Sequence, residues 1–309
     1  MTSVLAKPIT DALKVDPVLK TLNLSCNNIG DEGAKVLASA LRVNAVLTEV
    51  NLSDNNLGGE TDYIKASEVE GESKEVGDKV IYEGREMISG VLAIAKALEV
   101  NEVLTHLITR NNNIRDEGAK ALAAALRVNE VLTNLELMGN NVGDEGATAL
   151  ASALRVNGVL NKLNISWNEI GPTGAAAIAD ALKGNTLRGT DPVESLDLSS
   201  EYLGPASAIV IASLIAGNAV LTDLYLFDNS IGDEGAMALA SALRVNGVLT
   251  HLDLGADQIR EQGAAAIAEA LRDNEVLKSV DLRGNNLGDE GKKAIQDAVS
   301  GREGFKLEM

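Results

Sequence analysis

The chain repeats one pattern with a period of 28 residues, and this period limits what the chain can fold into. The segment LKTLNLSCNNIG, which begins at Leu19, returns at Leu47 as LTEVNLSDNNLG, 28 residues later. Nine copies begin at Leu19, Leu47, Leu104, Leu132, Leu160, Val193, Leu221, Leu249 and Leu277. Repeats of this length indicate a solenoid, in which each unit packs only against its neighbours. We therefore expect one elongated domain over residues 1–309.

Two spacings in the array are longer than 28 residues. The second and third copies begin 57 residues apart, and the fifth and sixth begin 33 residues apart. We assign the excess to an insertion at residues 60–88 in the second copy and to a short loop extension at residues 187–192. The long insertion is acidic and lacks the repeat pattern, and residues 79–88 predict a β-hairpin that turns at Glu83 and Gly84. It is either a flap that contacts a partner or a mobile decoration.

Within each copy the spacing of apolar residues changes from a strand pattern to a helix pattern. Segments such as LTHLDL alternate apolar and polar residues, which indicates a short strand with one buried face. In GDEGAMALASALRVN, Ala236, Leu239, Ala240 and Leu243 fall on one face of a helix. Asp233 stands where the N-cap of this helix is expected. Because strands pack about 4.8 Å apart and helices about 8–10 Å apart, the array must curve with a parallel sheet on its concave face.

The motif LxxLxLxxN in a 28-residue helical unit resembles the ribonuclease-inhibitor type of leucine-rich repeat. The resemblance covers essentially the whole chain outside the insertions. The GDEGA…LASALRVN units and the ending GKKAIQDAVSGREGFKLEM also resemble leucine-rich repeat proteins of unicellular algae and protists. This resemblance implies an α/β horseshoe of about nine repeats, with a parallel sheet on the concave face, helices on the convex face and a role in protein binding.

Both ends of the array look finished, as is expected of a solenoid with capped ends. Residues 1–18 include a segment similar to the helical half of a repeat, and we expect them to form an N-terminal helical cap. Residues 302–309 contain Phe305, Leu307 and Met309 in an alternating run, which predicts a last edge strand or plug. The chain is therefore expected to be a complete protein.

Charge and composition narrow the classes of partner. The formal net charge is −18, from 27 Lys and Arg against 45 Asp and Glu, so nucleic acid would be repelled and a basic protein favoured. The sequence has no apolar run of about 18 residues, so no membrane insertion is expected. A single cysteine, Cys26, excludes an intramolecular disulfide and fits a reducing, cytoplasmic compartment.

Residues with catalytic or metal-binding chemistry are few and far apart. The two histidines, His106 and His251, fall five strands apart, a separation of roughly 24 Å at the spacing of strands in a sheet. Cys26 has no neighbouring histidine, and the sequence contains neither a phosphate-binding GxxxxGK[ST] loop nor a CxxC pair. We expect no enzymatic activity, no small-molecule substrate, no cofactor and no metal.

Two sets of polar residues recur with the repeat, and both have structural explanations. Asp-Glu pairs at the helix starts complement the helix dipole, although they also form an acidic rim that would attract a cation or a basic partner. An asparagine after each strand is expected to satisfy backbone groups in the turn. This asparagine ladder comprises Asn27, Asn55, Asn112, Asn140, Asn168, Asn229 and Asn285, with Glu201 and Asp257 at the equivalent positions.

The middle of the concave face is the predicted binding site. Its outward positions hold small polar or acidic residues in most copies, but the central copies carry aromatic residues, which make up only 2% of the chain. Small residues between aromatic ones predict a shallow cleft, and clustered exposed aromatic residues indicate binding anchors. The predicted partner-binding residues are Met138, Trp167, Asp197, Ser199, Tyr225, Phe227 and His251.

The function that these observations favour is a non-catalytic scaffold for protein–protein interaction, which binds a partner on the concave face. One alternative is a regulator of a small GTPase that accelerates GTP hydrolysis, for which Arg110 is the candidate arginine. Another alternative is a structural subunit of a large algal or protist assembly.

Overall fold

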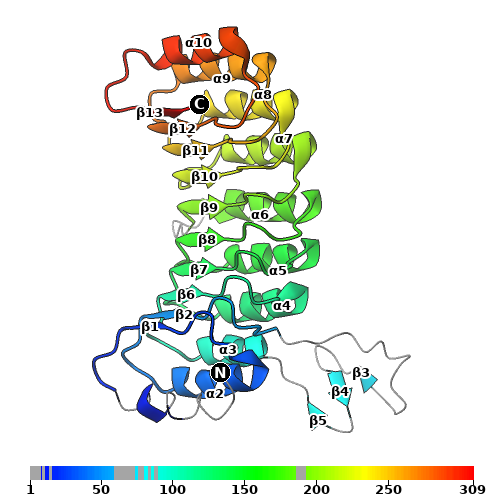
Figure 1. Ribbon diagram of the computed structural model, residues 1–309, viewed down its shortest axis with the longest axis vertical. Helices are drawn as coiled ribbons and strands as arrows, with labels where there is room; N and C mark the ends of the chain where they lie inside the picture. The colour runs from blue at the N-terminus through cyan, green and yellow to red at the C-terminus, as the bar shows by residue number, and fades with distance from the viewer. Residues whose placement is uncertain are drawn as a thin grey trace.

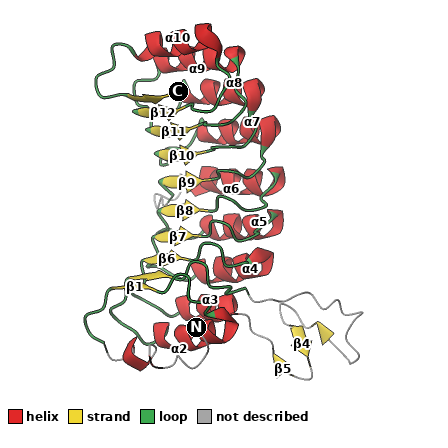
Figure 2. Cartoon of the chain, viewed as in Figure 1, coloured by secondary structure: helices red, strands yellow, loops and turns green. Residues whose placement is uncertain are grey.

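A single parallel sheet with helices along one of its faces forms the body of the molecule (Figure 1). The computed structural model describes residues 8, 11–13, 16–58, 74–75, 80–82, 85–86, 90–185 and 193–309. Within these ranges the strands stack along the long axis, and the helices form a second layer beside them (Figure 2). Each strand pairs with the next in register, as Asp223 with His251 and Tyr225 with Asp253. The predicted leucine-rich repeat solenoid is confirmed.

The strands are short and the helices are about three turns long. The ten parallel strands of the described residues are β1 (Thr21–Asn23), β2 (Glu49–Asn51), β6 (His106–Ile108), β7 (Asn134–Glu136), β8 (Lys162–Asn164), β9 (Ser195–Asp197), β10 (Asp223–Tyr225), β11 (His251–Asp253), β12 (Ser279–Asp281) and β13 (Lys306–Glu308). The helices that follow them are α2 (Gly30–Leu41), α3 (Gly90–Leu98), α4 (Arg115–Leu126), α5 (Asp144–Leu154), α6 (Pro172–Asn185), α7 (Gly204–Ile215), α8 (Gly232–Leu243), α9 (Glu261–Asp273) and α10 (Gly288–Val299). Of the described helices, none is long and apolar enough to cross a membrane.

The core lies between the two layers and continues from one repeat to the next. In the seventh copy it contains Leu224 from the strand and Leu239 from the helix, both buried. Neighbouring helices meet at the glycine of the GDEGA segment. A Cβ atom at Gly235 would lie 2.2 Å from Cγ2 of Ile231 and 2.7 Å from Cβ of Ala208, so only glycine permits this approach. The helices therefore pack through small residues, and each repeat depends on its neighbours for burial.

The asparagine ladder expected from the sequence is confirmed. Asn140 Oδ1 accepts the backbone N–H of Asn112 at 2.9 Å, while its Nδ2 donates to the carbonyls of Thr109 and Leu137 at 2.9 and 2.8 Å. A second ladder, which the sequence analysis did not identify, runs along the helix ends. Asn129 Nδ2 donates to the Leu98 carbonyl at 2.8 Å, and its Oδ1 accepts the N–H of Leu132 at 2.8 Å. Buried asparagines thus connect adjacent repeats at both ends of the strands.

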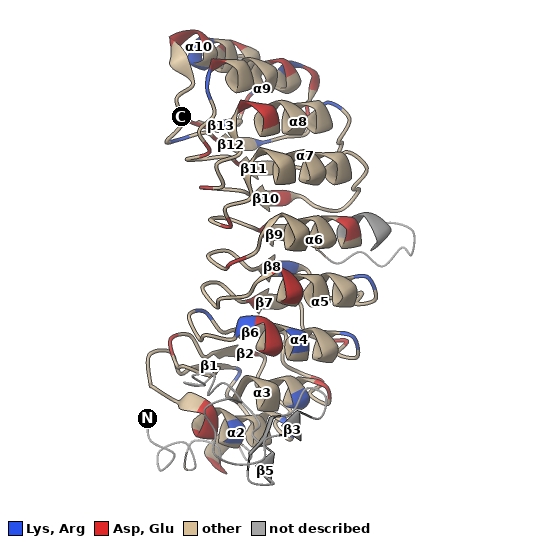
Figure 3. Cartoon of the chain, turned by 90° about the vertical axis from the view of Figure 1, so that its right-hand side faces the viewer, with Lys and Arg blue, Asp and Glu red and all other residues tan. Residues whose placement is uncertain are grey.

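The prediction that Asp233 caps its own helix is wrong, because it caps the helix of the next repeat. Helix α8 starts with Ile231 at its N-cap and has no side-chain cap. The Asp233 carboxylate instead accepts the N–H groups of Arg260 and Gly263, at 2.8 and 2.9 Å, at the start of α9. In a solenoid the N-terminus of the following helix is one helix spacing away and presents unpaired N–H groups to this carboxylate. Figure 3 shows acidic residues recurring at the helix starts along the stack.

The two ends and the insertions are partly outside the described residues. In the long insertion, β4 (Val80–Tyr82) pairs antiparallel with β5 (Arg85–Glu86), as a hairpin requires, and β3 (Lys74–Glu75) adds a third strand. The predicted turn at residues 83–84 and the extension at residues 187–192 lie outside the described residues. At the carboxyl end, β13 pairs with β12 as an edge strand. Near the amino end, Asn44 Nδ2 donates to the Leu13 carbonyl at 2.6 Å, and Leu13 takes the place of a helix end in the second ladder.

Candidate interaction surface

The exposed side of the sheet presents three rows of side chains, one residue per repeat. The first row consists of the first residue of each strand, the second row of the third residue, and the third row of the residue two positions beyond the strand. In the central repeats the first row holds Asn134, Lys162, Ser195, Asp223 and His251; the second holds Glu136, Asn164, Asp197, Tyr225 and Asp253; and the third holds Met138, Ser166, Ser199, Phe227 and Gly255.

Tyr225 lies between two carboxylates in the second row. It is in register with Asp197 on β9 and with Asp253 on β11. Burial raises the pKa of the Tyr225 phenol, and the neighbouring charges of Asp223, Asp197 and Asp253 raise it further. Burial also raises the pKa of Asp253. The centre of the sheet is therefore negative and holds one phenol that remains protonated at neutral pH.

Each of these two carboxylates uses one oxygen for its own turn. Asp197 Oδ1 accepts the N–H of Ser199 at 3.0 Å, and Asp253 Oδ1 accepts the N–H of Gly255 at 2.9 Å. In the part of the chain that the structure describes, the Oδ2 atoms of both residues form no hydrogen bond or ion pair. One acceptor oxygen on each side of Tyr225 is therefore available to a partner.

Phe227 is the exposed aromatic residue of the third row. Its side chain is 39% exposed, and its ring lies against Gly255 on the next repeat, where a Cβ atom would be only 2.9 Å from Cδ2. Met138, three repeats earlier, is half-buried. Ser199 lies between them and is buried, so it presents little surface to a partner.

Trp167 does not belong to these rows, which corrects its expected position on the sheet. Strand β8 ends at Asn164, so the strand alternation stops before Trp167 and the residue lies in the turn, with a φ of 57°. Its indole is 57% exposed. The Trp167 N–H donates to the Ser199 carbonyl at 3.0 Å, and the Ser200 N–H donates to the Phe227 carbonyl at 2.8 Å. Trp167 and Phe227 thus lie two repeats apart along the same set of turns.

Tyr202 is an exposed residue that the sequence analysis missed. It lies in the turn after β9, with a φ of 53°, and is 83% exposed. Its signal in the sequence is an aromatic residue where other copies have asparagine, as at Asn113 and Asn141. We call Trp167, Tyr202 and Phe227 the aromatic rim. They follow three adjacent parallel strands, so they all lie at the carboxyl edge of the sheet.

His251 is held on the sheet by a carboxylate of the neighbouring strand. Its Nδ1 lies 2.8 Å from Oδ1 of Asp223 and 2.8 Å from Oγ1 of Thr250. His106 is on β6, five strands away from β11, as the repeat spacing predicts. Among the described residues, no group of three or more His, Cys, Asp or Glu side chains is placed to hold a metal ion.

Arg110, the candidate for GTPase regulation, is already bound within the protein. Its Nε donates to Oε2 of Glu136 at 2.7 Å, across the adjacent strands β6 and β7. At the other end of the third row, Arg283 pairs with Asp281 and, at 2.8 Å, with Glu308. In the Arg110 pair, Nε and one terminal nitrogen of the guanidinium are bound to Glu136, whose carboxylate opposes the positive charge that a phosphate would contact.

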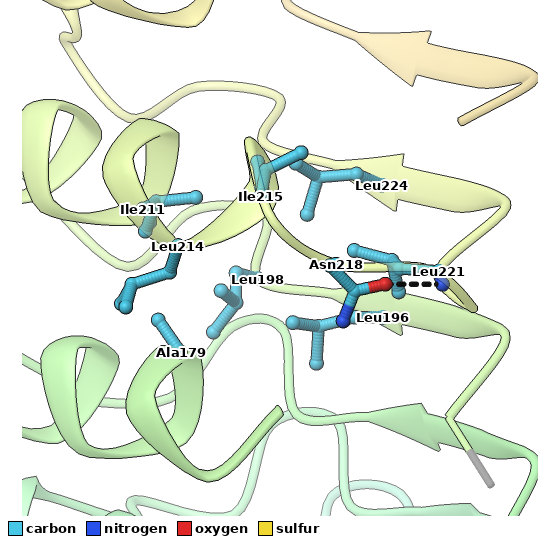
Figure 4. A pocket seen from close by; sticks show the side chains of 9 residues that line it. All are labelled: Ala179, Leu196, Leu198, Ile211, Leu214, Ile215, Asn218, Leu221 and Leu224. Atoms are coloured by element: carbon cyan, nitrogen blue, oxygen red, sulfur yellow. Dashed lines mark hydrogen bonds between the residues drawn. The ribbon is translucent and has the colours of Figure 1, made fainter. Parts of the chain in front are cut away.

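A small apolar cavity lies inside the solenoid, between α6, α7, β9 and β10 (Figure 4). Its volume is about 20 Å³, which is room for a group the size of one water molecule. A cavity of this size cannot hold a cofactor or a metabolite. It is lined by Ala179, Leu196, Leu198, Ile211, Leu214, Ile215, Asn218, Leu221 and Leu224.

Comparison with known proteins places the chain in a family. The family model described as "Leucine Rich repeat" matches residues 15–38, 43–60, 100–123, 128–151, 156–179, 217–240 and 273–295, more than half of the chain. No curated protein matches the sequence. Among solved structures, the chain is similar to the leucine-rich repeat-containing protein LegL7 from Legionella pneumophila, with 16% identity, a TM-score of 0.47 and coverage of 95% of both chains. It is also similar to actin-binding site 2 of leiomodin-1, with 17% identity, a TM-score of 0.34 and coverage of 58% of this chain and 85% of that one. With seven matched segments in an array of parallel strands and helices, the chain belongs to the leucine-rich repeat family.

Proposed function

We propose that the protein is a non-catalytic scaffold that holds a protein partner against the carboxyl edge and centre of its concave sheet. The observation that carries this proposal is the aromatic rim. Its three side chains are 57%, 83% and 39% exposed, on consecutive repeats of a chain that has only 2% aromatic residues. Leucine, valine and alanine build the core, so the fold does not need these rings. Large aromatic residues that cluster on a surface are the usual anchors of protein interfaces.

The charge of the neighbouring sheet indicates a basic partner. Asp197 and Asp253 flank Tyr225, and each leaves one carboxylate oxygen free in the described part of the chain. The whole chain carries a net charge of −18. A lysine or arginine of the partner would bind between these carboxylates while apolar side chains contact the rim. Such complementarity increases the association rate and selects against acidic partners.

A matched comparison of variants tests this proposal. The bait variant is Trp167→Ala/Tyr202→Ala/Phe227→Ala, and the control is Val100→Ala/Val128→Ala/Val156→Ala, which removes exposed apolar side chains at three helix ends. We expect one protein from a native lysate to be retained by the wild type and by the control but lost from the rim variant. That protein should then bind purified wild type directly, and more weakly at high salt.

Two results would contradict the proposal. The first is equal recovery of every specific protein by the wild type and by the rim variant, which would place binding elsewhere. The second is a fall of more than about 10 °C in the melting temperature of the rim variant, which would show that these rings are part of the core.

A further inference from the structure

Two positions of the asparagine ladder hold acids, and only one of them leaves an oxygen atom unpaired. At Asn229, which lies between them, Oδ1 accepts the Glu201 N–H at 2.9 Å and Nδ2 donates to the carbonyls of Leu198 and Leu226 at 2.9 and 2.8 Å. At Asn285, Nδ2 donates to the carbonyls of Leu254 and Leu282 at 2.7 and 3.0 Å. The ladder amide therefore has one accepting and one donating end, and the donating end faces two carbonyl oxygens.

Asp257 has the shape of asparagine but no amide hydrogen. Its Oδ1 accepts the N–H groups of Asn229 and Ile231 at 2.8 and 3.4 Å, as the ladder requires. Its Oδ2 is buried and has no hydrogen-bond partner. This oxygen occupies the place of the amide Nδ2, and by equivalence with Asn229 and Asn285 the groups at that place are the carbonyls of Leu226 and Leu254. A carboxylate oxygen would be repelled by them, whereas a carboxyl O–H would donate to one of them.

Glu201 differs because both of its oxygens are paired. Oε1 accepts the N–H of Asn168 at 2.7 Å, and Oε2 accepts the N–H of Ile170 at 2.9 Å. The two hydrogen bonds suit a carboxylate, although burial raises the pKa of Glu201 to about 8. The geometry that requires a proton is therefore specific to Asp257.

We propose that Asp257 is a neutral carboxylic acid in the folded protein, whose Oδ2–H replaces the amide N–H of the ladder, so that loss of this proton weakens the junction between the seventh and eighth repeats. This junction, the 7–8 seam, consists of the hydrogen bonds that join residues 228–232 to residues 255–257. It includes the N–H of Asp228 to the carbonyl of Gly255 at 2.9 Å and the N–H of Gly232 to the carbonyl of Asp257 at 2.8 Å.

The charges around Asp257 favour its protonated form, as does the position of its unpaired Oδ2. Burial, with smaller contributions from the carboxylates of Asp253, on β11, and Asp228, in the turn of the preceding repeat, raises its pKa to about 7, although the N–H groups of Asn229 and Ile231 lower it. The adjacent ladder positions are the neutral Asn229 and Asn285. An aspartate in an unfolded chain titrates near 3.9. Between about pH 4 and pH 7, Asp257 therefore holds a proton while the hydrogen bonds of the 7–8 seam are formed and loses it when they are broken. The seam therefore weakens as the pH rises from about 4 to about 7, and the loss is complete above the folded pKa.

Hydrogen exchange at single backbone amides tests this inference without any partner. The probes are the N–H groups of Asn229 and Ile231, which donate to Asp257. The internal control is the pair Asn112 and Ile114, which donate to Asn140 at 2.9 and 3.4 Å in nearly the same geometry. After correction for intrinsic exchange, we expect protection at Asn229 to fall about 10-fold between pH 6 and pH 8.5, as a group with a folded pKa near 7 dictates. Protection at Asn112 should stay constant.

Two variants complete the test. In Asp257→Asn, protection at Asn229 should become as independent of pH as protection at Asn112. In Asn229→Asp, the same sensitivity should appear at the N–H groups of Glu201 and Leu203, which donate to position 229. Identical pH profiles for the wild type and Asp257→Asn would overturn the inference. If Asp257→Asn does not fold, Asn229→Asp decides, and an unchanged profile at Glu201 would overturn the inference.

Discussion

The carboxylate of Asp116, in the first turn of α4, accepts the N–H of Gly146 in α5 at 2.8 Å, 30 residues later in the chain. The same oxygen accepts the N–H of Gly143 at 2.7 Å. Asp233 repeats this relationship toward Gly263. An acid that belongs to one repeat thus caps the helix of the next, and the cap contributes to the interface between repeats as well as to the helix. In a solenoid, such interface contributions determine whether neighbouring repeats unfold together.

Replacing Asp116 with alanine should lower the free energy of unfolding by about 1 kcal/mol, as the loss of a helix cap does. The neighbouring variant Glu117→Ala is the control, because Glu117 is exposed and pairs only with Lys120, at 2.7 Å, in the described structure. An exposed ion pair contributes little to stability. Urea unfolding followed by circular dichroism measures both variants, and equal effects of the two would contradict the capping role.

Gly235 should not tolerate alanine, although alanine favours helices. The added Cβ atom would lie 2.2 Å from Cγ2 of Ile231 and 2.7 Å from Cβ of Ala208. We expect the helices to move apart and the free energy of unfolding to fall by about 1–3 kcal/mol, as in other overpacked cores. Gly247→Ala, where no atom lies within 4 Å of the added Cβ, should be neutral or slightly stabilising. Thermal unfolding of the two variants distinguishes close packing from backbone flexibility.

Replacing each of the two buried acids of the ladder with its amide should change the free energy of unfolding in opposite directions. Asp257→Asn supplies the missing hydrogen-bond donor. It also removes a group with a raised pKa, which lowers the stability of the wild type as the pH rises toward about 7. The stability of this variant relative to the wild type should therefore be greater at pH 8.5 than at pH 6. Glu201→Gln places an amide NH₂ against the N–H of Asn168 or Ile170, and should destabilise by about 1–3 kcal/mol at pH 6. Urea unfolding at the two pH values measures these differences. Destabilisation by both variants at pH 8.5 would contradict the assignment of the Oδ2 proton.

The sequence predicts the array of strands and helices well because the same apolar spacing recurs in every copy. It also predicts the role of Asn140 and its equivalents, because a polar residue in a buried turn has few other uses. It does not predict that Asp233 caps α9, because periodicity describes one repeat and carries no information on bonds to the next. It misplaces Trp167 because the outward residues of that repeat are Lys162, Asn164 and Ser166, and the chain turns at Trp167 with a positive φ. The missing partner of Asp257 Oδ2 is visible only in three dimensions.

Trp167 has a left-handed backbone conformation that is unfavourable for tryptophan. A substitution at this position can therefore test whether the indole stabilises the core or is available for binding. The φ of Trp167 is 57°, and the equivalent residues of other copies, which include Gly139, Gly284 and Asn111, also have a positive φ. A side chain in this left-handed region costs about 1 kcal/mol except for glycine or asparagine. We expect Trp167→Asn to change the free energy of unfolding by less than about 1 kcal/mol, because relief of this cost offsets the lost burial of an indole that is 57% exposed. Ala256→Gly, at the equivalent position, should be stabilising by a few tenths to 1 kcal/mol, which shows the backbone contribution by itself. A loss of more than about 3 kcal/mol in Trp167→Asn, measured by urea unfolding, would assign the indole to the core and remove it from the aromatic rim.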